Sequence, residues 1–233
     1  MKTIKYIGGL LFFIIIHACN NDDDSNDLRI VYENNFIETL FLEAGETAPP
    51  VVNWSGEKGT FSATTLPITA PDDLFNRNLS IDEETGVLSW DRSIPLGETE
   101  VFITASNSLE STTISVTINN TFIEGLFYGG FNDDISDNPD TSMIDSNNSI
   151  SFTKEGTVGL LGTSDGDIIS MDGTWTIDES LITINFNANN RVLKGIMNAR
   201  NGSPAATFTG QWGEGLDQNN AIENVRGAFR FTQ

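Results

Sequence analysis

Residues 79–90 of the chain read Leu79-Ser80-Ile81-Asp82-Glu83-Glu84-Thr85-Gly86-Val87-Leu88-Ser89-Trp90. Apolar and polar side chains alternate at both ends of this stretch, while its middle is acidic and ends at Gly86. Alternation is typical of a strand with one buried face, and glycine can take the positive φ that many tight turns require. The stretch therefore predicts a strand, a turn and a second strand.

The chain on both sides of this hairpin also predicts strands, and residues 28–120 fit one domain. Short β-branched and aromatic runs recur between Gly, Asn and Asp clusters, whereas helical periodicity is nearly absent. In residues 112–118, Ile114, Val116 and Ile118 alternate with Ser and Thr, so these apolar side chains share one face. Two facing sheets would bury such faces, and this length of chain suits a β-sandwich.

The hairpin continues through Pro95-Leu96-Gly97 into Val101-Phe102-Ile103-Thr104-Ala105-Ser106-Asn107-Ser108. Over about 40 residues this pattern resembles the Ig-like, cadherin-like repeats of bacterial surface proteins. Those repeats carry a Leu-x-Ile-Asp-x-x-Thr-Gly-x-Leu-x-Trp/Gly hairpin, a Pro and Gly turn, and a Val-x-Ile-x-Ala-x-Asn strand. The resemblance implies an Ig-like fold for residues 28–120 and says much less about function.

A second domain is predicted over residues 121–233. Eight or nine strands with short turns favour an antiparallel up-and-down β-barrel, because closure removes exposed edges; a second sandwich is the alternative. The segment is loosely similar to lipocalin-like and avidin-like barrels. Only short stretches such as 221–225 could form a helical turn. The candidate strands are 123–131, 149–153, 157–162, 167–171, 173–177, 181–186, 192–198, 206–212 and 227–232.

The N-terminus predicts export and lipidation. Residues 1–18 carry Lys2 and Lys5, a ten-residue apolar run and a small residue before Cys19, as in a secretory signal peptide. The residues Ile16-His17-Ala18-Cys19 resemble a bacterial lipobox, with Ile where Leu is usual and His where a small residue is usual. The resemblance implies that Cys19 receives the acyl chains that anchor the protein to a membrane.

An acidic tether is predicted over residues 19–27, since this stretch is too polar to bury apolar surface. It is similar to the acidic stretch behind the lipidated cysteine of surface lipoproteins in the Bacteroidetes. The similarity implies the outer face of the outer membrane; a spacer facing the periplasm is the alternative.

Charge and residue usage exclude several functions. Without residues 1–18 the chain keeps 10 basic and 33 acidic residues, a net charge of −23, which disfavours nucleic acid as a partner. The only histidine is His17 and the only cysteine is Cys19, so the mature chain would lack His- and Cys-based catalysis, zinc sites and disulfides. We expect no enzyme activity and no cofactor.

Two groups of residues are candidate binding sites. Carboxylates that could ligate calcium recur in the loop after residue 131, although the loop lacks the EF-hand glycine and terminal Glu, and a solvated loop is the simpler interpretation. These are Asp133, Asp134, Asp137 and Asp140. Trp212, flanked by glycines, with Tyr128 and Phe131 could stack on a sugar, whereas Trp90 and Trp175 are expected in the core.

The expected function is therefore a non-catalytic, surface-displayed lipoprotein that binds an extracellular glycan or a partner protein. Three alternatives stay open: a lipid or small-molecule carrier barrel, a calcium-dependent adhesion module, and a glycan-acting hydrolase, which needs only two carboxylates.

Overall fold

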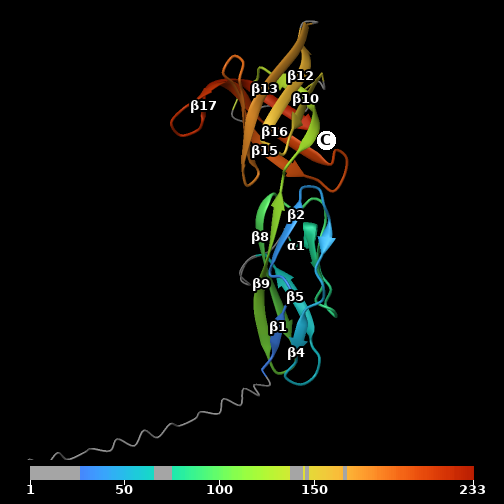
Figure 1. The fold of residues 1–233 in the computed structure, drawn as a ribbon. Coiled ribbons are helices and arrows are strands. Elements are labelled where there is room, and N and C mark those ends of the chain that lie inside the picture. Colours follow the sequence, from blue (N-terminus) through green and yellow to red (C-terminus); the bar gives the residue numbers. More distant parts are fainter. Residues whose placement is uncertain (1–26, 66–74, 137–143, 145–146, 165–166) are drawn as a thin grey trace, which may run out of the picture.

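The computed structural model describes residues 27–65, 75–136, 144, 147–164 and 167–233. The predicted signal peptide, Cys19, tether residues 20–26, Asp137 and Asp140 lie outside this range. The prediction of an all-β protein is confirmed, with one four-residue helical turn, α1 (Phe75–Asn78). No helix of the described chain is long and apolar enough to span a bilayer. Figure 1 shows a sandwich joined end to end with a barrel.

The sandwich contains three sheets, with strand orders β2-β9-β8-β5, β3-β7-β6 and β1-β4. Most neighbours are antiparallel, but β2 and β9 run parallel. The larger two sheets share one core, in which Val116 and Ile118 are fully buried and Ile114 is partly buried, as their alternation predicts. The strands are β1 (Arg29–Val31), β2 (Phe36–Leu40), β3 (Gly45–Glu46), β4 (Val51–Asn53), β5 (Thr60–Thr64), β6 (Leu79–Ile81), β7 (Leu88–Trp90), β8 (Gly97–Ser106) and β9 (Ser111–Thr121).

The predicted hairpin over residues 79–90 is confirmed. β6 pairs antiparallel with β7, and Gly86 has a φ of 73°. The Asp82 carboxylate accepts hydrogen bonds from the backbone N–H groups of Thr85 (2.8 Å) and Glu84 (2.9 Å), and these bonds lower its pKa. The Asp82 carboxylate therefore stabilises the backbone of the turn. Trp90 is buried, as expected.

The C-terminal domain is a closed antiparallel barrel of eight strands, each paired with the next and β17 paired with β10. The predicted barrel is therefore confirmed, and the alternative, a second sandwich, is wrong. The strands are β10 (Gly125–Asn132), β11 (Asn148–Phe152), β12 (Thr157–Ser164), β13 (Asp167–Asp178), β14 (Leu181–Phe186), β15 (Arg191–Ala199), β16 (Ala206–Leu216) and β17 (Ile222–Thr232).

Two details of the barrel correct the sequence interpretation. The candidate strands 167–171 and 173–177 form one strand, β13, because Asp172 and Gly173 stay paired with β12 and inward alternation continues from Met171 through Gly173. The helical turn suggested for 221–225 is wrong, because residues from Ile222 onward pair with β16. Tertiary pairing overrides the weak local preference there.

Side chains fill the centre of the barrel. Eight strands enclose a space just wide enough for packed side chains. Rings meet edge to face, for example Phe152 with Phe127 at 5.8 Å and with Phe208 at 5.9 Å between centroids. Gly195 leaves room for the Phe229 ring, because a β-carbon at Gly195 would lie 2.7 Å from that ring. A lipid carrier would need the volume that these rings occupy.

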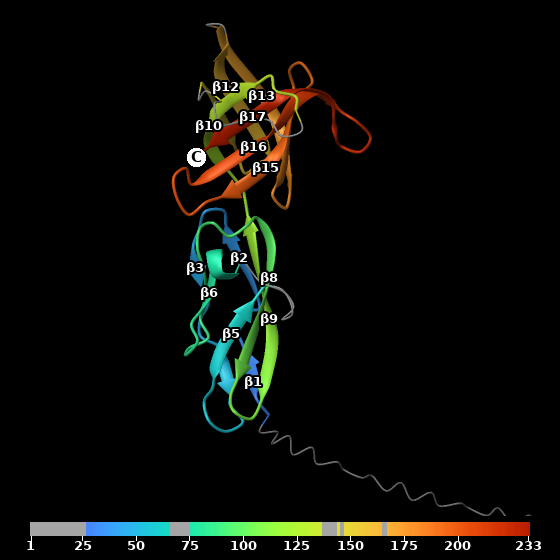
Figure 2. The same cartoon turned by 180° about the vertical axis from the view of Figure 1, so that it is seen from behind.

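One end of the barrel rests on the sandwich (Figure 2). Leu96, in the loop before β8, is buried in the barrel's hydrophobic cluster, and Phe41 and Leu42 pack against the same cluster. Phe41 also meets Phe122, which links the two domains, edge to face at 5.5 Å. The side chain of Asn120 donates hydrogen bonds to the carbonyl oxygens of Ile94 (2.8 Å) and Pro95 (3.2 Å), which fixes the Leu96 loop.

Candidate functional site

The barrel end away from the sandwich contains a cavity of about 320 Å³, which we call the barrel mouth. β10 begins beside the sandwich and ends at Asn132, and β15 begins at Arg191, so both residues lie at this rim. Nine residues line the mouth: Phe131, Asp133, Asn147, Asn148, Leu160, Thr163, Ile169, Arg191 and Trp212. Aromatic, cationic and polar side chains therefore meet at the open end of the barrel.

Strand alternation directs two of the predicted aromatic residues into the mouth. Phe131 shares the inner face of β10 with Phe127, and Trp212 shares the inner face of β16 with Phe208. Their rings lie edge to face with centroids 5.9 Å apart. The Trp212 indole N–H donates a hydrogen bond of 2.9 Å to the carbonyl oxygen of Asn132, so the ring is fixed to the neighbouring rim.

A β-bulge lies beside Trp212. Trp212 pairs with Gly227, whereas Gly213 pairs with Val225, so the register between β16 and β17 shifts by one residue at this point. A bulge bends a strand and can re-aim the adjacent side chain. A β-carbon at Gly227 would lie 2.8 Å from the Trp212 indole nitrogen, so the glycine leaves space for the ring.

Arg191 lies over both rings. Its guanidinium carbon is 4.7 Å from the Trp212 ring centroid and 5.6 Å from that of Phe131. Desolvation lowers the pKa of Arg191, and the charge of Glu214 acts in the opposite direction. Arginine stays charged under these conditions, so the half-buried guanidinium places a positive charge beside the two rings. Within the described residues, no carboxylate forms a salt bridge with Arg191.

The rim of the mouth is polar. Asp133 follows β10, and Asn147, Asn148 and Thr163 line the adjoining wall, where β11 and β12 lie next to β10. Asn132 fixes the loop at its start, since its side-chain oxygen accepts hydrogen bonds from the backbone N–H groups of Asp134 (3.2 Å) and Ala228 (3.0 Å). The mouth thus combines flat apolar rings with acceptors and donors around its edge.

The structure separates Tyr128 from the other predicted aromatic residues. Tyr128 lies three residues before Phe131, and an odd separation along a strand places the two side chains on opposite faces. It is 53% exposed on the outer wall of the barrel, where it lies beside Leu161 and Ile168 around a shallow depression. Trp175 is partly buried and packs against the barrel core. Phe131 and Trp212 are therefore together, and Tyr128 is not with them.

The acidic candidates are only partly described. Asp133 is exposed and lines the mouth, and the Asp134 carboxylate accepts a hydrogen bond of 2.9 Å from the backbone N–H of Ser136. Among the residues for which the structure gives positions, no three His, Cys, Asp or Glu side chains form a group that could hold a metal. The calcium hypothesis also involves Asp137 and Asp140, which lie outside the described residues.

Arg191 is the residue that the sequence analysis missed. Asn189 and Asn190 have φ values of 60° and 52°, as in the two-residue hairpin turn that Asn favours. This Asn-Asn pair marks where β15 begins, and alternation from Leu193 then places Arg191 on the inner face. A charged residue at an inward position next to a strand end was the available signal.

The chain has only weak similarity to known proteins. No known family matches the chain, and no curated protein sequence matches it. A Bacteroides fragilis protein assigned as an alpha-galactosidase is similar in structure, with 19% identity and a TM-score of 0.31 over 40% of this chain; the match spans 17% of that protein. Extracellular domains 3–5 of Drosophila OTK give 12% identity and a TM-score of 0.28 over 88% of each chain. Both TM-scores are too low to indicate a shared fold.

Proposed function

We propose that the protein is a lipid-anchored, non-catalytic binding protein of the cell envelope whose barrel mouth takes an extracellular saccharide. One observation carries the proposal: Trp212, Phe131 and Arg191 form a stacked group inside an open cavity with a polar rim. Aromatic faces bind the apolar C–H surface of a sugar ring, and the polar rim satisfies its hydroxyl groups.

The size of the mouth limits the ligand. A volume of about 320 Å³ is at the lower end of the range for small-molecule sites, so it suits one or two sugar rings at the end of a glycan. The filled barrel centre stops the ligand from passing deeper. The proposed site is thus shallow and accessible to a glycan that is still attached to a larger molecule.

The proposed anchor agrees with this arrangement. The sandwich lies between the N-terminal end of the described chain and the barrel (Figure 1), so lipid on Cys19 and the tether would leave the barrel as the part farthest from the membrane. In this proposal the sandwich, with its Ig-like pattern, is a spacer. The acidic surface keeps the displayed molecule soluble.

Binding is favoured over hydrolysis by the composition of the mouth. Glycoside hydrolysis requires two carboxyl groups facing the bond that is cut. Asp133 is the single acidic residue among the described residues that line the mouth. The mouth also contains two aromatic rings, Phe131 and Trp212, and the cation of Arg191, which are groups that bind a ligand without cutting it.

A glycan array with the purified protein tests the proposal, with Trp212→Ala as the main variant. We expect the variant to lose about tenfold or more in affinity for the saccharide that binds, because the ring that packs against the sugar is removed and about 1.4 kcal/mol corresponds to tenfold. Tyr128→Ala is the matched control, since it removes an exposed aromatic ring on the outer wall. Arg191→Gln tests the same site without removing a ring from the barrel core.

Two outcomes would contradict this function. Equal loss in Tyr128→Ala and Trp212→Ala would place binding elsewhere, and unchanged binding in Trp212→Ala and Arg191→Gln would remove the mouth as the site. The anchor is tested separately by palmitate labelling of the wild-type protein and of Cys19→Ser. A label retained in Cys19→Ser would show that Cys19 is not the acylated residue.

A further inference from the structure

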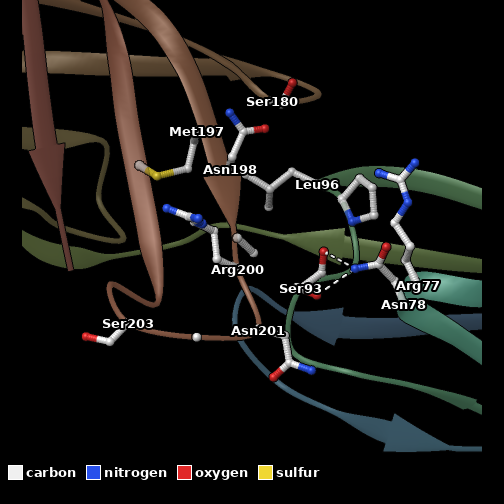
Figure 3. A pocket seen from close by; sticks show the side chains of 13 residues that line it. Arg77, Asn78, Ser93, Leu96, Ser180, Met197, Asn198, Arg200, Asn201 and Ser203 are labelled. Carbon is white, nitrogen blue, oxygen red and sulfur yellow. Dashed lines mark hydrogen bonds between the residues drawn. The ribbon is translucent and has the colours of Figure 1, made fainter. Parts of the chain in front are cut away.

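The turn between β15 and β16 carries the one Asn-Gly pair of the sequence, Asn201-Gly202. Both residues are exposed, and Figure 3 shows Asn201 on this turn, near the sandwich loop that carries Ser93. Asn201, Gly202 and Ser203 also line a cavity of about 580 Å³ at the junction of the two domains. Water therefore has access to the turn from outside and from the cavity.

An Asn-Gly pair is the sequence at which asparagine most readily loses its amide. The backbone nitrogen of the following residue attacks the side-chain carbonyl carbon, and glycine has no β-carbon that would hinder this approach or restrict the backbone. A new C–N bond closes a cyclic imide, and the proton of the attacking N–H ends on the departing ammonia. Water then opens the imide, which leaves an aspartyl or an isoaspartyl residue. Overall, one water is consumed and one ammonia is released.

The conformation of the turn permits this attack. The turn is closed at its base by a 2.7 Å hydrogen bond from the Arg200 N–H to the Ala205 carbonyl oxygen, so Asn201 and Gly202 belong to its exposed tip. A β-carbon built on Gly202 would meet no other atom within 4 Å. In the part of the chain that the structure describes, no group accepts a hydrogen bond from the Gly202 N–H. The tip can therefore rotate without breaking a bond between backbone groups.

The amide group at risk is also a contact between the domains. The Asn201 side chain donates a hydrogen bond of 2.9 Å to one oxygen of Asp91, in the sandwich loop after β7. The other Asp91 oxygen accepts hydrogen bonds from the Ser93 N–H (2.8 Å) and hydroxyl (2.6 Å). The bond from Asn201 is exposed, so water competes for both groups and the amide is released at intervals.

Neither product of the reaction can restore this contact. An aspartyl carboxylate has no proton to donate, and it would face the carboxylate of Asp91. An isoaspartyl residue lengthens the main chain by a methylene group and shortens the side chain. The Arg92 guanidinium donates a hydrogen bond of 2.8 Å to the Gly202 carbonyl oxygen and so keeps the turn near the sandwich, where the two like charges repel each other.

We propose that Asn201 is a self-modifying site: attack by the Gly202 nitrogen converts it irreversibly into an aspartyl or isoaspartyl residue and thereby loosens the contact between the sandwich and the barrel. Water is the only co-reactant. The site is separate from the barrel mouth and does not depend on the ligand proposed there. Older molecules then hold the barrel less firmly on the sandwich than newly made molecules do.

Mass spectrometry of the purified full chain, before and after incubation in warm, mildly alkaline buffer, tests the modification. A protease that cuts after Glu releases the fragment from Ser180 to Glu214, which contains Asn201 and five other asparagines, none of them followed by glycine. We expect the mass increase of an amide converted to an acid to appear at position 201 first. The other five asparagines serve as internal references in the same fragment.

Gly202→Ala is the matched control for the chemistry, because its β-carbon has open space in the folded protein. It should slow the conversion at position 201 at least about tenfold, since the β-carbon hinders the attacking nitrogen. Conversion at position 201 that is no faster than at the other asparagines, or equally fast in Gly202→Ala, would overturn the proposed site.

Thermal melts of full-chain variants test the effect on the junction. Asn201→Asp imitates one product and should melt about 2–4 °C below the wild-type protein. Asn185→Asp adds the same charge at an exposed position of β14 and should melt like the wild-type protein.

An exchanged pair shows whether Asp91 is the cause. Asp91→Asn combined with Asn201→Asp places the donor on the sandwich and the acceptor on the barrel, and the new amide oxygen can still accept from Ser93. The pair should recover most of the loss seen in Asn201→Asp. Wild-type melting of Asn201→Asp, or an exchanged pair that melts as low as Asn201→Asp, would overturn the link between this modification and the junction.

Discussion

Asp91 and Asn201 are 110 positions apart in the chain, and yet the Asn201 amide donates a hydrogen bond of 2.9 Å to the Asp91 carboxylate. One residue belongs to the loop after β7 and the other to the turn between β15 and β16. This bond crosses the domain junction, where it lies beside the apolar contact made by Leu96. The two domains are therefore joined by polar and apolar contacts as well as by the peptide chain.

A double-mutant cycle on this pair measures the polar contact. Asn201→Ala should lower the free energy of unfolding by about 1 kcal/mol, because an exposed hydrogen bond to a charged group is lost. In the Asp91→Ala background, which also loses the bonds to Ser93, the same substitution should cost almost nothing. Urea unfolding of the four proteins gives the coupling energy. A coupling of zero would mean that the bond contributes nothing to the junction.

The apolar contact made by Leu96 should contribute more to stability than the hydrogen bond between Asp91 and Asn201. Leu96→Ala removes a side chain that is buried in the barrel cluster but belongs to the sandwich, and we expect a loss of about 2–5 kcal/mol. Leu109→Ala is the control, since Leu109 is 71% exposed and its loss should change stability by less than about 0.5 kcal/mol. Calorimetric melting measures both. If Leu96→Ala melts like Leu109→Ala, the domains do not stabilise each other through this contact.

Close packing inside the barrel is tested at Gly195. An alanine β-carbon there would lie 2.3 Å from the Thr209 carbonyl oxygen and 2.7 Å from the Phe229 ring. We expect Gly195→Ala to destabilise the protein by about 1–3 kcal/mol or more, because backbone and ring must move. Gly202→Ala places its β-carbon more than 4 Å from other atoms and should be neutral within about 0.5 kcal/mol. Equal melting temperatures for the two variants would contradict the tight packing around Phe229.

Alkaline pH should weaken the sandwich through Tyr32. The Tyr32 hydroxyl donates a hydrogen bond to the Gly86 carbonyl oxygen, and burial raises the pKa of Tyr32 from 10.0 to about 12. Between these two pH values the unfolded chain ionises this tyrosine more readily than the folded protein does. The contribution of Tyr32 to stability is therefore complete below pH 10 and is lost as the pH rises toward about 12.

Tyr32→Phe isolates this effect. At neutral pH the variant should be less stable by about 1 kcal/mol, since it lacks the hydrogen bond to Gly86. Above pH 10 the difference from the wild-type protein should shrink, because phenylalanine cannot ionise. Tyr128→Phe, altered at an exposed tyrosine, should follow the wild-type curve throughout. A constant difference between wild type and Tyr32→Phe across this pH range would contradict the assignment.

Local patterns in the sequence were sufficient to predict much of the fold. Alternation at Ile114, Val116 and Ile118 identified a buried face, and Gly86 identified a turn, because each depends on residues next to one another in the chain. The parallel pairing of β2 with β9 depends on residues about 80 positions apart, and no local pattern specifies it. The single strand β13 was divided at Asp172 because an exposed acid and a glycine resemble a turn when the neighbouring strands are not known.

The candidate site was predictable only in part. Trp212 and Phe131 were identified as ring types suited to sugars, but their proximity follows from barrel closure and from the bulge at Trp212. Arg191 gained its position over the rings from the same closure.

The parallel pairing of β2 and β9 also has a mechanical consequence. The chain enters the sandwich through β1, continues into β2 and leaves for the barrel from the end of β9; β2 and β9 lie side by side over five residue pairs, from Phe36 with Thr117 to Leu40 with Thr121. Tension between the N-terminal end and the barrel would load these strands lengthwise, in shear, so that their hydrogen bonds must rupture together instead of unzipping in turn. A chain whose only cysteine is Cys19 thus has, in one pair of strands, a clamp against pulling that needs no covalent cross-link.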